Sequence, residues 1–272
     1  MTKADALQTD AIKKSALENI DLFVLDMDGT FYLGDELIEG STHFLDCVEK
    51  CGKHFMFFTN NASKSPQAYI DKLEKMGVYI TREQIMTSGD VTIEFLKTYH
   101  DGARVYLNGT DILRDSFIQE GINLVDESPD IAIQSFDTQM TYERMNKICR
   151  FIRDGATFLS THMDYNCPVK DGFIPDSGSM CAFITASTGV KPRYLGKPFR
   201  ETLDMVVSRS GVNAKNIAFV GDRLYTDVAT AVNNGASGFL VLSGESDLNT
   251  VEESDVSPTA IYDSLGEIAQ YL

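Results

Sequence analysis

FVLDMDGT, residues 23–30, places two aspartates directly behind an apolar run and ends in Gly29-Thr30. The run Leu22–Leu25 is short and continuously apolar, which is typical of a strand buried on both faces of a sheet. Two like charges at the end of one buried strand are electrostatically costly unless a cation compensates them. The stretch therefore predicts a buried strand whose end serves a chemical purpose.

The same pattern of an apolar run with a polar tip occurs at two other places. The run 55–58 breaks into Thr59-Asn60-Asn61, and the run 215–220 ends in Gly221-Asp222. Helices are expected over 41–51, 66–76 and 227–234, and a further strand over 238–242. Strands that alternate with helices predict a parallel α/β sheet of the Rossmann-like kind.

The carboxyl ends of parallel strands lie along one edge of a sheet, where ligands bind. We therefore expect one group of polar side chains at that edge: Asp26, Asp28, Thr59, Asn60, Asn61 and Asp222. An oxygen-only set of ligands favours Mg²⁺, and these strand ends offer no His or Cys set suited to zinc.

The middle of the chain has an alternation of its own. Strands are expected over 104–107, 130–133 and 156–159, with helices over 110–120 and 142–153. A run of this length is enough for a small domain inserted into the first. The predicted organisation is a core over 1–81 and 189–272 that carries an α/β insert over 82–188.

Charge and composition limit the classes of ligand and the cellular location that we expect. The 272 residues carry a net charge of −16, which argues against nucleic acid as a partner, while leaving room for a small phosphorylated ligand beside a bound cation. No apolar run is long enough for a membrane helix, and the polar N-terminus lacks the apolar core of a signal peptide, so we expect a cytoplasmic protein. The five cysteines form no CxxC pair and are expected to be reduced thiols. Whether the spacing of His43, Cys47, Cys51 and His54 has a role stays open.

Four motifs resemble those of the haloacid dehalogenase (HAD) superfamily. Asp26-Met-Asp-Gly-Thr30 is similar to its DxDGT signature, and Phe57-Phe-Thr-Asn-Asn61 is similar to its second motif. Gly196-Lys-Pro198 resembles its lysine motif, and Gly221–Asp227 (GDRLYTD) resembles its closing acidic motif. They occur in the order and spacing of the family and cover nearly the whole chain.

The resemblance implies roles for the catalytic residues. Asp26 would be the nucleophile that forms an aspartyl-phosphate, and Asp28 would be the general acid and then the general base. Thr59, Asn60 and Lys197 would bind the phosphoryl oxygens.

The same resemblance implies a Mg²⁺ site. Asp26, the main-chain carbonyl of Asp28, and Asp222 would hold the ion, and Asp227 would support it directly or through water.

The insert resembles the C2-type cap of the branch that contains NagD-like proteins, p-nitrophenyl phosphatases and pyridoxal-phosphate phosphatase. Residues 160–168 and 172–179 resemble the segment that faces the substrate, so we take as candidate contacts the residues His162, Asp164, Tyr165, Asn166 and Cys167. The chain departs from that branch at three places. It has His162-Met163-Asp164 where the branch usually has Asn-x-Asp, Pro175-Asp176 where it often has Pro-Gly, and Cys167 where some relatives carry a larger residue.

The function predicted is a Mg²⁺-dependent phosphatase of small phosphomonoesters: sugar phosphates, nucleotides or cofactor-type compounds. A phosphomutase on the same fold and a noncatalytic phosphosugar-binding protein are the alternatives. A signalling receiver domain, which also carries an aspartyl-phosphate, is far shorter and lacks both the second Asp and the insert. The partner expected is a small phosphorylated metabolite, with a homodimer or tetramer through the cap as a possible assembly.

Overall fold

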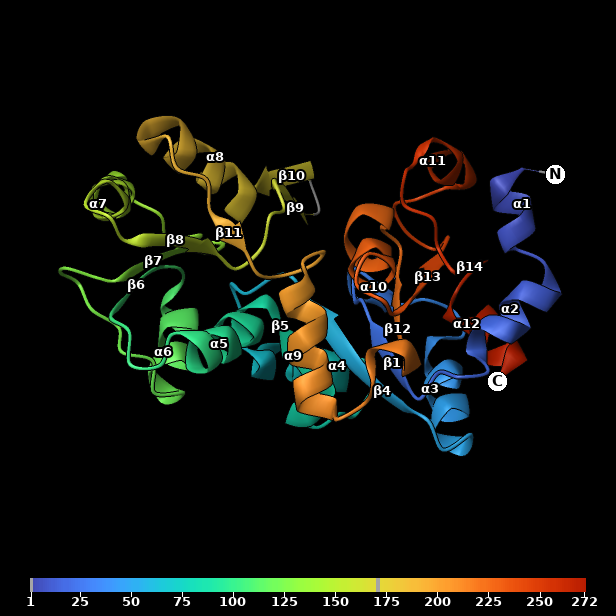
Figure 1. Ribbon diagram of the computed structural model, residues 1–272. Helices are drawn as coiled ribbons and strands as arrows, with labels where there is room; N and C mark the ends of the chain where they lie inside the picture. Colours follow the sequence, from blue (N-terminus) through green and yellow to red (C-terminus); the bar gives the residue numbers. More distant parts are fainter. Residues whose placement is uncertain (1, 170–171) are drawn as a thin grey trace. The chain divides into compact units, whose positions relative to one another are not determined.

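The computed structural model describes residues 2–169 and 172–272, and the chain forms two compact units. Unit 1 comprises residues 1–59, 70–86 and 202–272, and unit 2 comprises residues 60–69 and 87–201. The core and insert boundaries proposed above, at 81/82 and 188/189, stay a prediction. Each unit has its own parallel sheet (Figure 1).

The sheet of unit 1 has six strands in the order β14-β13-β12-β1-β4-β5. The strands are β1 (Leu22–Leu25), β4 (His54–Thr59), β5 (Ile85–Thr87), β12 (Ile217–Gly221), β13 (Ser237–Val241) and β14 (Ala260–Tyr262). The pairs from β14 to β4 are all parallel. The predicted Rossmann-like parallel sheet is therefore confirmed.

The register of this sheet brings three strand ends together. Leu25 lies opposite Val220 on β12 and opposite Phe57 on β4, so the residues after these positions share one edge. The ladder continues one residue further, because the amide of Asp26 donates to the carbonyl of Val220 at 2.8 Å. Asp26 thus leaves the strand at a fixed point beside β12.

All four residues of β1 are buried, as its continuous apolar run predicts. The ring of Phe23 packs edge-on against Phe44, with centroids 5.3 Å apart, and Phe31 packs against Phe57 at 4.8 Å. The remaining elements of unit 1 are α1 (Lys3–Leu7), α2 (Asp10–Leu17), β2 (Tyr32–Leu33), β3 (Glu36–Leu37), α3 (Ser41–Lys50), most of α4 (Pro66–Lys75) and α9 (Arg200–Ser210), α10 (Ala229–Val232), α11 (Leu248–Glu253) and α12 (Leu265–Ile268).

Unit 2 has a four-stranded parallel sheet in the order β11-β8-β7-β6. Its strands are β6 (Val105–Asn108), β7 (Ile131–Gln134), β8 (Thr157–Ser160) and β11 (Arg193–Tyr194). Two helices, α7 (Tyr142–Arg153) and α8 (Ser177–Thr188), lie on one side of this sheet (Figure 1), and their buried faces form a core with strand residues such as Tyr106 and Phe158. The helices α5 (Ser88–Tyr99) and α6 (Asp111–Gln119) lie on the other side, and an antiparallel hairpin, β9 (Asn166–Val169) and β10 (Gly172–Pro175), precedes α8.

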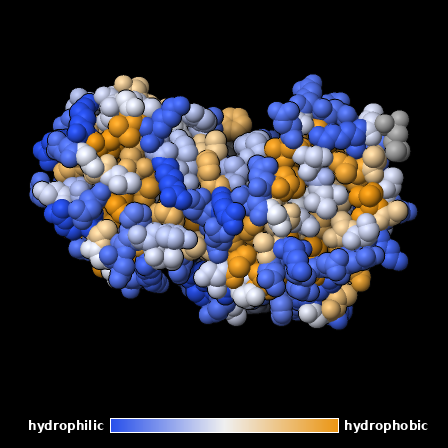
Figure 2. Space-filling view, viewed as in Figure 1, coloured by the Kyte–Doolittle hydropathy of each residue, from blue (hydrophilic) through white to orange (hydrophobic). Residues whose placement is uncertain are grey.

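The visible surface is mostly hydrophilic, with smaller hydrophobic patches (Figure 2). Within the described ranges, no helix combines the length and the apolar character needed to cross a membrane. All five cysteines are free thiols.

Candidate active site

Three carboxylates of unit 1 converge. Asp26 follows β1, Asp222 follows β12, and Asp227 lies on the π-helical turn Leu224–Val228 that comes next. One carboxylate oxygen from each lies within 4.8 Å of the other two. The expectation that strand ends bring Asp26 and Asp222 together therefore agrees with the geometry, and Asp227 joins them.

The packing around these carboxylates depends on glycines. A Cβ on Gly244 would lie 2.0 Å from Oδ2 of Asp222, and a Cβ on Gly221 would lie 2.2 Å from Cγ of Asp227. A methyl group does not fit at either position, so the backbone approaches both acids as closely as only glycine permits. Sequence reasoning did not single out Gly244, because nothing in the sequence shows that the loop after β13 returns to Asp222.

The electrostatics of the group are unfavourable at Asp222, although the positive charge of Arg223 offsets part of the negative charge of Asp26 and Asp222. Burial, followed by the nearby charge of Asp227, raises the pKa of Asp222 to about 6. One stabilising contact is the hydrogen bond that the amide of Glu245 donates to Oδ2 of Asp222 at 2.8 Å. Oxygen ligands this close together fit a hard divalent cation.

Asp28 lies apart from the three converging carboxylates. Its side chain is exposed and does not belong to the group, so the expectation of a metal contact concerns its main-chain carbonyl alone. The turn that follows is held by the amide of Gly29, which donates to the carbonyl of Tyr32 at 2.8 Å. The exposed Asp28 carboxyl is thus accessible for proton transfer.

A second polar cluster lies in unit 2 and is organised by Asn60. Its Oδ1 accepts from the amide of Lys197 at 2.9 Å, and its Nδ2 donates to the carbonyl of Lys197 at 3.1 Å and to Oδ2 of Asp164 at 3.0 Å. Both Asn60 and Lys197 are buried. The side chain of Asn60 therefore fixes the backbone at Lys197 and orients Asp164.

The neighbouring candidate contacts, on the loop after β4 and on the segment that leads from β8 into β9, vary in exposure. Asn61 Nδ2 lies 3.9 Å from Sγ of Cys167, which is partly buried. Asn166 is exposed, and Tyr165 is 58% exposed. These candidate contacts therefore line an accessible stretch of unit 2.

His162 is different, because its side chain is fully buried. Protein groups occupy both ring nitrogens: Asp176 lies at 2.8 Å from Nε2, and Thr161 Oγ1 lies at 2.9 Å from Nδ1. Sequence reasoning named His162 as a candidate substrate contact, and it named position 176 only as a departure from the branch. The contact between them has no signal in the sequence, since the two residues are 14 positions apart across a loop and a hairpin.

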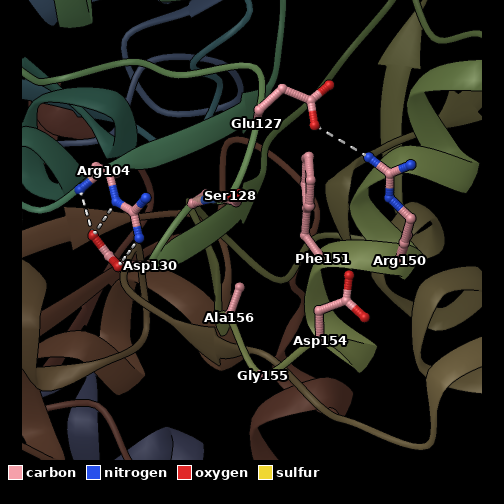
Figure 3. A pocket seen from close by; sticks show the side chains of 10 residues that line it. Arg104, Glu127, Ser128, Asp130, Arg150, Phe151, Asp154, Gly155 and Ala156 are labelled. Carbon is pink, nitrogen blue, oxygen red and sulfur yellow. Dashed lines mark hydrogen bonds and ion pairs between the residues drawn. The ribbon is translucent and has the colours of Figure 1, made fainter.

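A cavity of about 760 Å³ lies elsewhere in unit 2, among residues that precede its strands (Figure 3). Its charged side chains pair with each other, Arg104 with Asp130 at 2.8 Å and Arg150 with Glu127 at 3.5 Å. The residues of the four motifs do not line it, since they follow strand ends. The size of a cavity therefore does not identify the candidate active site in this chain.

Comparison with known proteins identifies the family. A model of haloacid dehalogenase-like hydrolases matches residues 23–123, and a related HAD hydrolase-like model matches residues 194–268. An acid sugar phosphatase of Staphylococcus aureus (strain MRSA252) is 32% identical over 246 residues, which cover 90% of this chain and 95% of that protein. The chain belongs to the haloacid dehalogenase-like hydrolases.

Solved structures place the chain within the NagD-like branch of this hydrolase family. A 4-nitrophenylphosphatase from Thermotoga maritima superposes with a TM-score of 0.90 at 42% identity, covering 94% of this chain and 98% of that one. NagD from E. coli K-12 superposes with a TM-score of 0.86 at 28% identity, covering 92% and 98%. The resemblance to the C2-capped NagD-like branch is confirmed, and this HAD hydrolase is a phosphatase.

Proposed function

We propose that this HAD phosphatase hydrolyses small phosphomonoesters through an aspartyl-phosphate on Asp26. The observation that carries the proposal is the convergence of Asp26 with Asp222 and Asp227. Asp26 is the first residue of the DxDGT motif and follows the end of β1. The names of the relatives, an acid sugar phosphatase and a 4-nitrophenylphosphatase, support sugar phosphates and small aryl phosphates as substrates. Nucleotides and cofactor-type phosphates are further members of the class to screen.

The residues suit a divalent cation, and we propose Mg²⁺. Asp26, Asp222 and the Asp28 carbonyl would hold it, with Asp227 in support. The fit rests on the oxygen-only donor set and on the raised pKa of Asp222, whose charged form is disfavoured by burial and by Asp227. When bound, the ion would neutralise carboxylate charge and polarise a phosphoryl oxygen.

The first half-reaction forms the covalent intermediate. A carboxylate oxygen of Asp26 attacks phosphorus, the bond from phosphorus to the ester oxygen breaks, and protonated Asp28 donates its proton to the departing alkoxide. By resemblance to the family, Thr59, the Asn60 amide and Lys197 would bind the phosphoryl oxygens, and Asn61 is a further candidate for phosphate binding. The products of this step are the free alcohol, the aspartyl-phosphate and an ionised Asp28.

The second half-reaction regenerates the enzyme. Ionised Asp28 accepts a proton from a water molecule as the water oxygen attacks phosphorus, and the bond to Asp26 breaks. Inorganic phosphate leaves, Asp26 is again a carboxylate, and Asp28 is again protonated.

Replacement of the nucleophile tests this mechanism. Asp26→Asn should abolish hydrolysis of p-nitrophenyl phosphate in saturating Mg²⁺, while Asp46→Asn, at an exposed position of α3, should leave it unchanged. Mass spectrometry after acid quenching should find one phosphoryl group on the wild-type peptide that contains Asp26. Near-normal turnover by Asp26→Asn would contradict the mechanism.

Product analysis separates hydrolysis from the phosphomutase alternative. A hydrolase releases one phosphate for each alcohol, whereas a mutase returns the phosphoryl group to a sugar. Assembly into a dimer or tetramer through the cap stays a prediction, which light scattering of the purified protein would measure.

A further inference from the structure

Two of the three places where unit 2 departs from the sequence pattern of its branch, His162 and Asp176, are in direct contact. His162 follows β8, and Asp176 is the residue before α8. Nε2 of His162 lies 2.8 Å from Oδ1 of Asp176, with exposures of 0% and 6% for the two side chains. A buried polar pair of this kind is costly unless every donor and acceptor is satisfied.

The hydrogen-bond network sets the protonation of the His162 ring. Two hydroxyl oxygens face Nδ1, Thr161 Oγ1 at 2.9 Å and Ser88 Oγ at 3.4 Å. Thr161 donates its only hydroxyl hydrogen to Ser135 Oγ at 3.0 Å, and Ser88 donates its own to the carbonyl of Asn60. Both oxygens can therefore present lone pairs to Nδ1, while a carboxylate oxygen faces Nε2. Acceptors beside both ring nitrogens suit a ring that carries a hydrogen on each of them, which is an imidazolium.

The charges around the ring agree with this assignment. Burial by itself lowers the pKa of His162, but the charge and hydrogen bond of Asp176 and the charge of Asp164 raise it overall above its ordinary value of 6.5. Asp176 faces the ring from the N-terminus of α8, and Asp164 from the loop after β8. The groups that face it from α5 and from the strand end, Ser88 and Thr161, are neutral.

Asp176 ties this ion pair to the loop 164–167. Its Oδ1 also accepts from the amide of Ser177 at 2.6 Å, which caps α8, and its own amide donates to the carbonyl of Tyr165 at 2.9 Å. The amide of Gly178 donates to the carbonyl of Asp164 at 2.8 Å. The first turn of α8 therefore holds the backbone of the loop at two successive residues.

His162 ties the same pair to Asn60. Ser88 Oγ lies beside the ring and donates to the main chain of Asn60, whose side chain holds Asp164 and the backbone of Lys197. Gly196 makes the approach possible, because a Cβ there would lie 2.6 Å from the carbonyl oxygen of Thr161. The pair thus links the loop 164–167 to the segment that carries Lys197.

We propose that His162 and Asp176 form a buried ion pair that positions the loop 164–167 for substrate recognition, so that His162 is a positioning residue. The proposal rests on the proposed function and on the expectation from the sequence that residues 164–167 contact the phosphomonoester substrate. His162→Gln would leave the buried Asp176 carboxylate without its partner, and Asp176→Asn would leave the His162 ring neutral. Either change loosens the loop, which should weaken substrate binding more than the chemical step.

The first test needs no turnover. In ¹⁵N-labelled protein at pH 7.5, comparison with His162→Gln assigns the signals of the His162 ring nitrogens. Both nitrogens should be protonated in the wild type. Asp176→Asn should remove that imidazolium signature, and His43→Gln, at an exposed position of α3, should leave it in place. A neutral His162 ring in the wild type at this pH would overturn the proposal.

The second test separates positioning from a merely structural role. Asp176→Asn keeps the side-chain shape and an oxygen that can cap α8. His162→Gln and Asp176→Asn should each raise KM for p-nitrophenyl phosphate about ten-fold, which corresponds to one lost charge-assisted hydrogen bond, and change kcat less than about two-fold. The KM of the double variant should be no higher than that of the single variant with the higher KM, because neither charge of the pair is then left unpaired.

Three outcomes of the second test would overturn the proposal: an unchanged KM in both single variants, a loss confined to kcat, or additive losses in the double variant. If the wild type hydrolyses no phosphomonoester, the proposed function fails, and the ¹⁵N experiment still decides whether the ion pair exists.

Discussion

Asp222 should destabilise the metal-free protein, and its replacement should therefore have opposite effects on stability and on activity. Burial and Asp227 raise its pKa to about 6 from the ordinary 3.8. A pKa difference of one corresponds to about 1.4 kcal/mol. Ionised Asp222 therefore lowers the free energy of unfolding by about 3 kcal/mol. Because the folded state binds this proton more tightly, stability falls as the pH rises from about 4 to about 6, and the full cost is present above about 6.

Asp222→Asn removes the charge and keeps the shape. The amide oxygen of the variant can still accept from the amide of Glu245, which lies 2.8 Å from Oδ2 of Asp222 in the wild type. In EDTA at pH 8 the variant should therefore unfold at a temperature about 6–12 °C above the wild type, as expected for about 3 kcal/mol in a chain of this size. In Mg²⁺ the order should change, because the wild type gains stability from binding the ion and the variant loses a ligand.

Thermal unfolding followed by circular dichroism at pH 4, 6 and 8 measures this prediction. In EDTA the advantage of Asp222→Asn should be small at pH 4 and should grow towards pH 8, while Asp46→Asn should track the wild type throughout. The reasoning is refuted if the variant melts below the wild type in EDTA at pH 8, or if the difference does not depend on pH.

Three further changes have clear expected outcomes. Asp28→Asn should slow turnover most for poor leaving groups, because they need protonation; steady-state rates across alkyl and aryl phosphates measure this, and a larger loss on p-nitrophenyl phosphate would contradict the role as acid. Gly196→Ala should lower stability by about 1–3 kcal/mol, since its Cβ would overlap the carbonyl oxygen of Thr161; denaturant unfolding would show it, and wild-type stability would contradict the contact. Phe57→Ala, in the fully buried aromatic cluster with Phe31, should lower stability by about 3–5 kcal/mol in the same assay, and a loss near zero would mean that the core closes over the missing ring.

The elements with a strong period were predictable from the sequence. The continuous apolar run at Leu22–Leu25 corresponds to β1, and the helix expected over 142–153 is α7. Both are long or apolar enough that tertiary context does not override the local signal.

Two of the elements that were missed lack such a signal. The helix α8 (Ser177–Thr188) is built from small and apolar residues with no polar face, so it shows no helical period. The strand β9 (Asn166–Val169) contains a proline, which sequence reasoning takes as evidence against a strand.

The contacts of the candidate site were likewise predictable from the sequence only in part. Asp26 and Asp222 could be placed together because parallel strand ends share an edge, which is a rule of topology. The contact of His162 with Asp176 could not be predicted, because it depends on the path of a loop and a hairpin. The glycine at 244 was equally hidden, since its importance comes from a neighbour in space.

The position of β1 between β4 and β12 has a consequence for synthesis on the ribosome. Residues 22–25 emerge early and can pair with β4 soon afterwards, but their other edge stays open until β12, at Ile217–Gly221, has been made. Until then a nascent chain displays an unpaired hydrophobic strand edge, which is a template for wrong association. Asp26 is thus translated well before Asp222 and Asp227, and the group of three carboxylates can form only after β12 and the turn that follows it have been made.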